Sequence, residues 1–204
     1  MIVDDLNCIF VHIPKCAGIS IESFFRKSGS LYMEWDEVNK IWMQHATASQ
    51  IKDLYCQKYE DYFSFTFVRN PWCRAVSDYF WMKRNLNLED SFKNYLLLKG
   101  NFDTQKLRYP HLNKKGRGDH LIPQSDFILN SNGEQMVDFI GKLENFQEDF
   151  NTVCDKIGIP RQKPPHKNKS KHKHYAEYYD DETRQIVAEK YAKDIEHFGY
   201  EFGE

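Results

Sequence analysis

The sequence predicts a three-layer α/β fold in which a short parallel sheet is flanked by helices. One observation is a β-branched apolar run, Leu6–Ile13, which stops at Pro14 and leads into an amphipathic helix from Gly18. The other is an aromatic and β-branched run, Tyr62–Val68, which leads through Asn70-Pro71 into a second helix. Both turns should therefore lie at the carboxyl ends of strands, where open α/β sheets bind ligands.

The first turn is suited to an anion. Lys15 follows the proline that ends the strand, and Gly18 begins the helix. Free N–H groups at a helix start, together with the helix dipole, favour a bound anion, and Ser20 adds a hydroxyl donor. Because the lysine precedes the glycine, the order differs from a Walker A loop, and an ordinary ATP-hydrolysing P-loop is not favoured.

The second turn repeats this arrangement. Arg69 stands at the end of the second strand, and Pro71 suits the first position of the following helix. Ser77 falls two turns into that helix. Two such turns on one parallel sheet predict a site for a ligand with two separate anionic ends.

The remaining elements follow from capping, periodicity and turn residues. Thr47–Gln50 predicts a capping box that opens a helix to about Gln57, and residues 100–119 predict a long loop or lid. The other predicted elements are helices at Ser91–Leu98, Asn145–Ile157 and Asp181–His197, and strands at Asp126–Leu129 and Val137–Ile140 around an Asn132-Gly133 turn.

Size and charge narrow the class of protein. A length of 204 residues with 41% apolar and 15% aromatic residues predicts one globular domain with a substantial core. The net charge of −2 does not favour a nucleic-acid partner. The sequence has no apolar run long enough to cross a membrane, and Asp4 and Asp5 interrupt any signal-peptide pattern. We therefore expect no membrane insertion and a cytoplasmic location.

The cysteines predict reduced thiols rather than a disulfide framework. There are five, an odd number, and none forms a C-x-x-C pair. Cys16 and Cys73 lie inside the two turns, where a role as small apolar filler is favoured over a redox or nucleophilic role.

The two turns, taken in this order, resemble the sulfotransferase superfamily that uses 3′-phosphoadenosine 5′-phosphosulfate. The nearest match is its carbohydrate-type branch, with the heparan and chondroitin sulfotransferases and small bacterial homologues. The resemblance extends to residues 120–124, 139–145 and 178–182, whereas residues 86–118 match no motif. It implies a P-loop-like fold and transfer of a sulfuryl group from that donor to a hydroxyl acceptor, with a carbohydrate favoured over a small phenol. No metal is required.

The resemblance also implies roles for single residues. Lys15 would contact the 5′-phosphosulfate, alongside Pro14, Cys16, Ala17, Gly18, Ile19 and Ser20, and Arg69 and Ser77 would hold the 3′-phosphate. The basic segment Arg161–His174 would close over the phosphates or an acidic acceptor, with Lys169 and Ser170 favoured. Two alternatives remain for this segment: a solvated loop, or metal binding by His172 and His174.

Sulfuryl transfer calls for a base that takes the proton of the acceptor hydroxyl, and histidine suits neutral pH. We favour His45, which lies at about the point where related glycosaminoglycan enzymes carry a catalytic histidine, and place His120 second, on the acceptor or cofactor side. His12 is expected to orient the first turn. Glutamate serves in some relatives, so Glu22 and Glu34 remain candidates.

Two other functions stay open from the sequence. A nucleotide-dependent kinase is weakened by the missing Walker A motif and by the absence of an obvious carboxylate for Mg²⁺. A non-catalytic module could instead keep the nucleotide or sulfate site only for binding. Oligomeric state carries no signal in the sequence.

Overall fold

The structure, a computed structural model, describes residues 1–25, 29–30, 35–36, 41–103, 118–165 and 173–204. The chain forms two compact units, each built from two stretches of sequence. Unit 1 contains Met1–Arg69 and Gln124–Asn168, and unit 2 contains Asn70–Pro123 and Lys169–Glu204. The two predicted turns begin in unit 1.

Unit 1 is built on a five-stranded sheet with the strand order β3-β1-β2-β6-β7. The strands are β1 (Ile2–Val3), β2 (Cys8–Val11), β3 (Gly29–Ser30), β6 (Phe63–Val68) and β7 (Phe139–Lys142). Strands β2, β6 and β7 are parallel, whereas β1 runs antiparallel to both of its neighbours. A separate pair, β4 (Trp35–Asp36) and β5 (Ile41–Trp42), is antiparallel.

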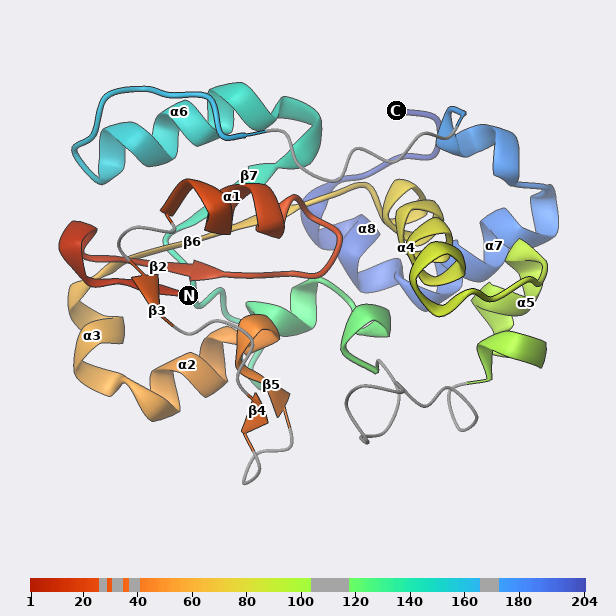
Figure 1. The fold of residues 1–204 in the computed structure, drawn as a ribbon, viewed down its shortest axis with the longest axis horizontal. Coiled ribbons are helices and arrows are strands. Elements are labelled where there is room, and N and C mark those ends of the chain that lie inside the picture. The colour runs from red at the N-terminus through yellow and green to blue at the C-terminus, as the bar shows by residue number, and fades with distance from the viewer. Residues whose placement is uncertain (26–28, 31–34, 37–40, 104–117, 166–172) are drawn as a thin grey trace. The chain divides into compact units, whose positions relative to one another are not determined.

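Helices cover both faces of this sheet (Figure 1). Helices α1 (Gly18–Phe25) and α6 (Phe146–Lys156) lie on one face, over a core that includes Phe10, Phe65 and Phe150. Helices α2 (Ala48–Leu54) and α3 (Cys56–Asp61) lie on the other face. The predicted layered α/β arrangement, with a sheet between helices, is therefore confirmed.

Unit 2 is helical and has an aromatic core. Its helices are α4 (Pro71–Leu86), α5 (Phe92–Leu97), α7 (Asp181–Lys190) and α8 (Ala192–Phe198). Tyr79, Tyr95, Phe102 and Tyr191 are buried among them. Asn70 caps α4, because its side-chain oxygen accepts hydrogen bonds from the N–H groups of Trp72 and Cys73.

Short 3-10 helices connect these elements. They are η1 (Asp4–Leu6), η2 (Met43–His45), η3 (Gly100–Phe102), η4 (Gly118–Leu121), η5 (Ser125–Phe127), η6 (Leu143–Asn145) and η7 (Tyr175–Tyr178). In the described part of the chain, no helix has the length and apolar character needed to cross a membrane.

Three local predictions were wrong. The predicted strand Asp126–Leu129 is replaced by η5, and Leu129 forms only an isolated bridge with Gln135. A short apolar run cannot distinguish these structures by periodicity alone. The predicted helix that opens at Thr47 breaks at Tyr55, and the final predicted helix breaks at Tyr191. In contrast, the capping box at Thr47 and helices α5 and α6 match their predictions.

Candidate functional site

The first turn, residues 12–17, lies between β2 and α1 and has an unusual backbone. Lys15 and Ala17 adopt the left-handed region, with φ of 69° and 64°. Such conformations are uncommon for residues other than glycine and concentrate at ligand sites. The carbonyl of Ala17 accepts the N–H groups of Ser20 and Ile21 as α1 begins. The first N–H groups of a helix lack intrahelical partners, so this end of α1 can bind an anion.

His12 explains why Gly18 is a glycine. A Cβ atom at position 18 would overlap the imidazole of His12, which is itself 3% exposed. The Nδ1 atom of His12 lies 2.7 Å from Oε1 of the buried Glu22. The ring of His12 therefore occupies the space that a side chain at position 18 would need.

Burial and hydrogen bonds set the charges of this pair. Burial lowers the pKa of His12, and its hydrogen bond to Glu22 offsets this only in part. Burial raises the pKa of Glu22, but hydrogen bonds from His12 and from Gln44, at 3.0 Å, bring that pKa below its usual value. The pair is therefore a neutral imidazole that donates from Nδ1 to a carboxylate.

His45 lies against this pair. Its ring meets the ring of His12 edge-on, with 4.8 Å between centroids, and its side chain is half-buried at the end of η2. The structure thus brings His45 to the histidine that lies on Gly18, beside the first turn.

The second turn is tied to the first by Gln124. The side-chain amide of Gln124 accepts from the N–H of Arg69 and donates to the carbonyl of Arg69, each at 2.8 Å. Its oxygen also accepts from Sγ of Cys16 at 3.1 Å. Arg69 donates from Nη1 to the carbonyl of Lys15 at 3.3 Å. The guanidinium of Arg69 therefore contacts the backbone of the first turn, at the carboxyl ends of β2 and β6 and within one unit.

In unit 2, α4 carries Ser77 and a buried polar network. Ser77 is 7% exposed. Asp78 lies 2.6 Å from Nδ1 of His120 and accepts from the hydroxyl of Tyr95 at 3.2 Å. Arg74 donates to the carbonyls of Ile122 and His120. His120 is thus a buried histidine oriented by a carboxylate.

The predicted site residues fall into three groups. Unit 1 brings together Pro14, Lys15, Cys16, Ala17, Gly18, Ile19, Ser20, Arg69, His45, His12 and Glu22, and unit 2 holds Ser77 and His120. Lys169, Ser170, His172 and Glu34 lie outside the described residues. Sequence reasoning missed the parts played by Gln124 and Gln44. The only signal for Gln124 was its place at the end of the segment 120–124, which carried no role of its own.

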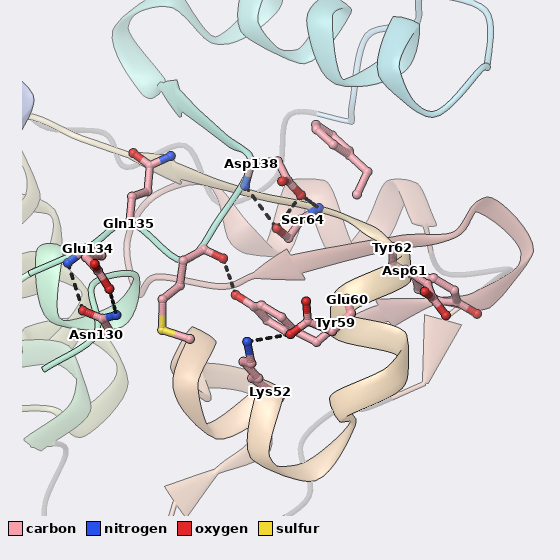
Figure 2. Close-up of a pocket in the computed structure, with 12 residues that line it drawn as sticks. Lys52, Tyr59, Glu60, Asp61, Tyr62, Ser64, Asn130, Glu134, Gln135 and Asp138 are labelled. Carbon is pink, nitrogen blue, oxygen red and sulfur yellow. Dashed lines mark hydrogen bonds and ion pairs between the residues drawn. The ribbon is translucent and has the colours of Figure 1, made fainter. Parts of the chain in front are cut away.

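A pocket of about 580 Å³ lies elsewhere in unit 1 (Figure 2). It opens beside Phe63 and Ser64, at the amino end of β6, whereas Arg69 follows the carboxyl end. Among the described residues that line it, four are acidic and one is a lysine, Lys52, which pairs with Glu60 at 2.6 Å. This lining disfavours an anionic ligand, so the candidate site is at the two turns.

Comparison with known proteins decides the family. The family described as "Sulfotransferase family" matches residues 1–201. The chain belongs to the sulfotransferase family. It is also similar to an uncharacterized protein of Archaeoglobus fulgidus, with 35% identity over 107 residues that make up 51% of this chain and 74% of that protein. Among solved structures, it is similar to the crystal structure of a sulfotransferase from Alicyclobacillus acidocaldarius, with a TM-score of 0.46, 17% identity, and coverage of 96% of this chain and 87% of that chain.

Membership of the sulfotransferase family supports sulfuryl transfer to a hydroxyl-bearing acceptor. The carbohydrate-type branch, which the sequence resembles, is a finer assignment than this match provides. The described residues of this sulfotransferase contain no group of three or more His, Cys, Asp or Glu side chains placed to hold a metal ion.

Proposed function

We propose that the protein transfers a sulfuryl group from 3′-phosphoadenosine 5′-phosphosulfate to a hydroxyl of a carbohydrate, at the carboxyl ends of β2 and β6. The observation that supports this most is that the two turns are linked: Arg69 donates to the carbonyl of Lys15, and Gln124 bonds to both Arg69 and Cys16. A donor with phosphate groups at both its 5′ and 3′ ends needs two cationic positions held at a fixed separation. The carbohydrate acceptor rests on the resemblance of the two motifs to the carbohydrate-type branch.

In the proposed reaction, the acceptor oxygen attacks sulfur in line with the bridging oxygen of the 5′-phosphate. The sulfur–oxygen bond to that phosphate breaks, 3′-phosphoadenosine 5′-phosphate leaves, and the acceptor proton passes to a base. Lys15 neutralises the charge that develops on the leaving oxygen, and the first N–H groups of α1 bind the same phosphate. Arg69 holds the 3′-phosphate, together with Ser77, Lys169 and Ser170 as the family motifs imply.

His45 is the proposed base, and its contact with His12 supports this choice. The ring of His12 contacts both His45 and Gly18 at the start of α1, so the base would stand near the turn that is proposed to bind the phosphosulfate. His120 is the alternative, because Asp78 orients its ring as a carboxylate orients a catalytic histidine.

Alanine variants separate the two histidines. His45→Ala is expected to lower kcat by about 10²-fold or more, the range for loss of general-base catalysis, while leaving the affinity for 3′-phosphoadenosine 5′-phosphate within about twofold. His120→Ala serves as the comparison, measured for kcat and affinity in the same assay. Loss of kcat in His120→Ala but not in His45→Ala would assign the base to His120.

The donor assignment is tested by calorimetric titration with three ligands: 3′-phosphoadenosine 5′-phosphate, adenosine 5′-phosphate, and ATP with Mg²⁺. We expect the first to bind at least tenfold more tightly than the second, since only the first has a 3′-phosphate. Stronger binding of ATP with Mg²⁺ would point to a kinase. Binding of the 3′-phosphorylated ligand without sulfation of any member of a glycan panel would point to a non-catalytic module.

A further inference from the structure

We infer that Gln124 is a positioning residue whose single buried amide holds the two proposed phosphate-binding turns in place. This inference rests on the proposed function for its ligand. It assigns a positioning role to a residue that lies outside the two turns.

The side chain of Gln124 forms hydrogen bonds with the backbone just beyond the last paired residues of the sheet. The ladder between β6 and β7 ends at the pair Val68↔Lys142, and that between β2 and β6 ends at Val11↔Thr66. At the next residue, Arg69, the N–H donates to Oε1 of Gln124 and the carbonyl accepts from Nε2 of Gln124, so this side chain takes the place of a neighbouring strand. The Gln124 side chain is fully buried, so no water replaces these bonds.

The same amide reaches the first turn. Oε1 of Gln124 accepts from Sγ of Cys16, whose neighbours Lys15 and Ala17 have the left-handed backbone. The backbone carbonyl of Lys15 in turn accepts a hydrogen bond from the guanidinium of Arg69. The Gln124 amide therefore fixes the backbone from which Arg69 extends, and it holds the turn that carries Lys15.

Few side chains can replace Gln124 here. The position needs an acceptor for two donors and a donor for one carbonyl, on a side chain of this length. Methionine has a similar length but lacks the amide, and asparagine keeps the amide but is one methylene shorter. Both substitutions should keep the side chain of Arg69 and remove the hydrogen bonds that Gln124 makes with the backbone of Arg69.

The test compares affinities for 3′-phosphoadenosine 5′-phosphate and adenosine 5′-phosphate in wild type, Gln124→Met, Arg69→Ala and the double variant. We expect Gln124→Met to reduce the ratio of the two affinities tenfold or more. In the Arg69→Ala background, Gln124→Met should change the ratio less than twofold, because Arg69 is the residue through which it acts. Gln124→Asn is measured in parallel, and it should also reduce the ratio if Gln124→Met does not fold.

Thr66→Val is the matched control. Thr66 is fully buried and donates from its hydroxyl to the carbonyl of Val11 at 2.7 Å, near the same end of the sheet. This variant loses a buried hydrogen bond without touching Arg69, so it should lower stability while keeping the affinity ratio. An unchanged ratio in the folded Gln124 variants, or an equal reduction in Thr66→Val, would overturn the inference.

A second readout needs no nucleotide. Cys16 is 1% exposed, and its thiol is held by Gln124. Gln124→Met should speed maleimide labelling of Cys16 at least fivefold relative to the buried Cys154, and equal labelling in wild type and variant would contradict the inference. If wild type prefers neither nucleotide, the proposed function fails, and this labelling still decides whether Gln124 holds the turn.

Discussion

At position 18, the space for a side chain is taken by the ring of His12. Gly18→Ala should push this ring away from Glu22 and break their 2.7 Å contact. We expect a loss of about 1–3 kcal/mol in the free energy of unfolding, typical of overpacking, together with lower turnover. Urea denaturation measures the first effect. The same substitution should have little effect in a His12→Ala background, and an equal loss there would contradict the steric explanation.

The charge state of the His12–Glu22 pair predicts a pH dependence. The pKa of His12 is lowered from 6.5 in the folded protein, so the unfolded chain binds this proton more readily, and stability falls as the pH drops below about 6.5. The pKa of Glu22 is lowered from 4.5, so its contribution is present above that value and is lost as the pH falls further.

Denaturation curves between pH 7.5 and pH 4 test this prediction. Wild type should lose stability over this range, and His12→Gln should show a shallower slope between about pH 7 and pH 5.5. Parallel slopes in wild type and His12→Gln would show that other groups carry the pH dependence.

At the scale of elements, the start of α4 depends on Asn70. Its side chain accepts from two N–H groups of the first turn of the helix and donates to the carbonyl of Glu201 at 2.8 Å. Asn70→Ala should lower the free energy of unfolding by about 1–3 kcal/mol, through loss of the cap and of the hydrogen bond to the carbonyl of Glu201.

Asn70→Asp separates the two contributions. It keeps the capping oxygen and loses the donor to Glu201, so its loss of stability in urea denaturation should be smaller than that of Asn70→Ala. A larger loss in Asn70→Asp would show that a buried carboxylate facing the carbonyl of Glu201 costs more stability than the retained cap contributes.

The elements that the sequence predicted well are those with local signals. The strand Tyr62–Val68 alternates aromatic residues with small polar ones, and the structure places β6 at Phe63–Val68. Thr47 forms the predicted capping box, and the predicted helix that starts at Ser91 is capped by the side chain of that serine. The break at Tyr191 has no such signal, because the residue at the break is a buried tyrosine and not a glycine or proline.

In the candidate site, too, the features with local sequence signals were predicted and those without them were not. The turns at Lys15 and Arg69 were predicted from proline, glycine and basic residues close together in sequence. The Gln124–Arg69 and His12–Gly18 contacts were not, since the first joins residues 55 positions apart and the second depends on the direction of a ring. The roles of the site residues, including Ser77, remain predictions.

At the scale of the whole molecule, a single domain of 1–204 remains a prediction. The chain passes between the two compact units at 69–70, 123–124 and 168–169, so neither unit is one continuous stretch. We therefore expect one cooperative unfolding transition, with a calorimetric enthalpy equal to the van't Hoff enthalpy. Differential scanning calorimetry measures both, and two resolved transitions would show that the units unfold independently.

The strand order also has a consequence for the nascent chain. One edge of β6 pairs with β2, which is made earlier, whereas the other edge pairs with β7 through contacts 74 residues further along. At about 5–20 residues per second, roughly 4–15 s pass before β7 emerges. During that interval the aromatic strand Phe63–Val68 presents an open edge that can pair with other chains. The time spent in this state is set by the rate of translation, and it does not depend on how stable the finished fold is.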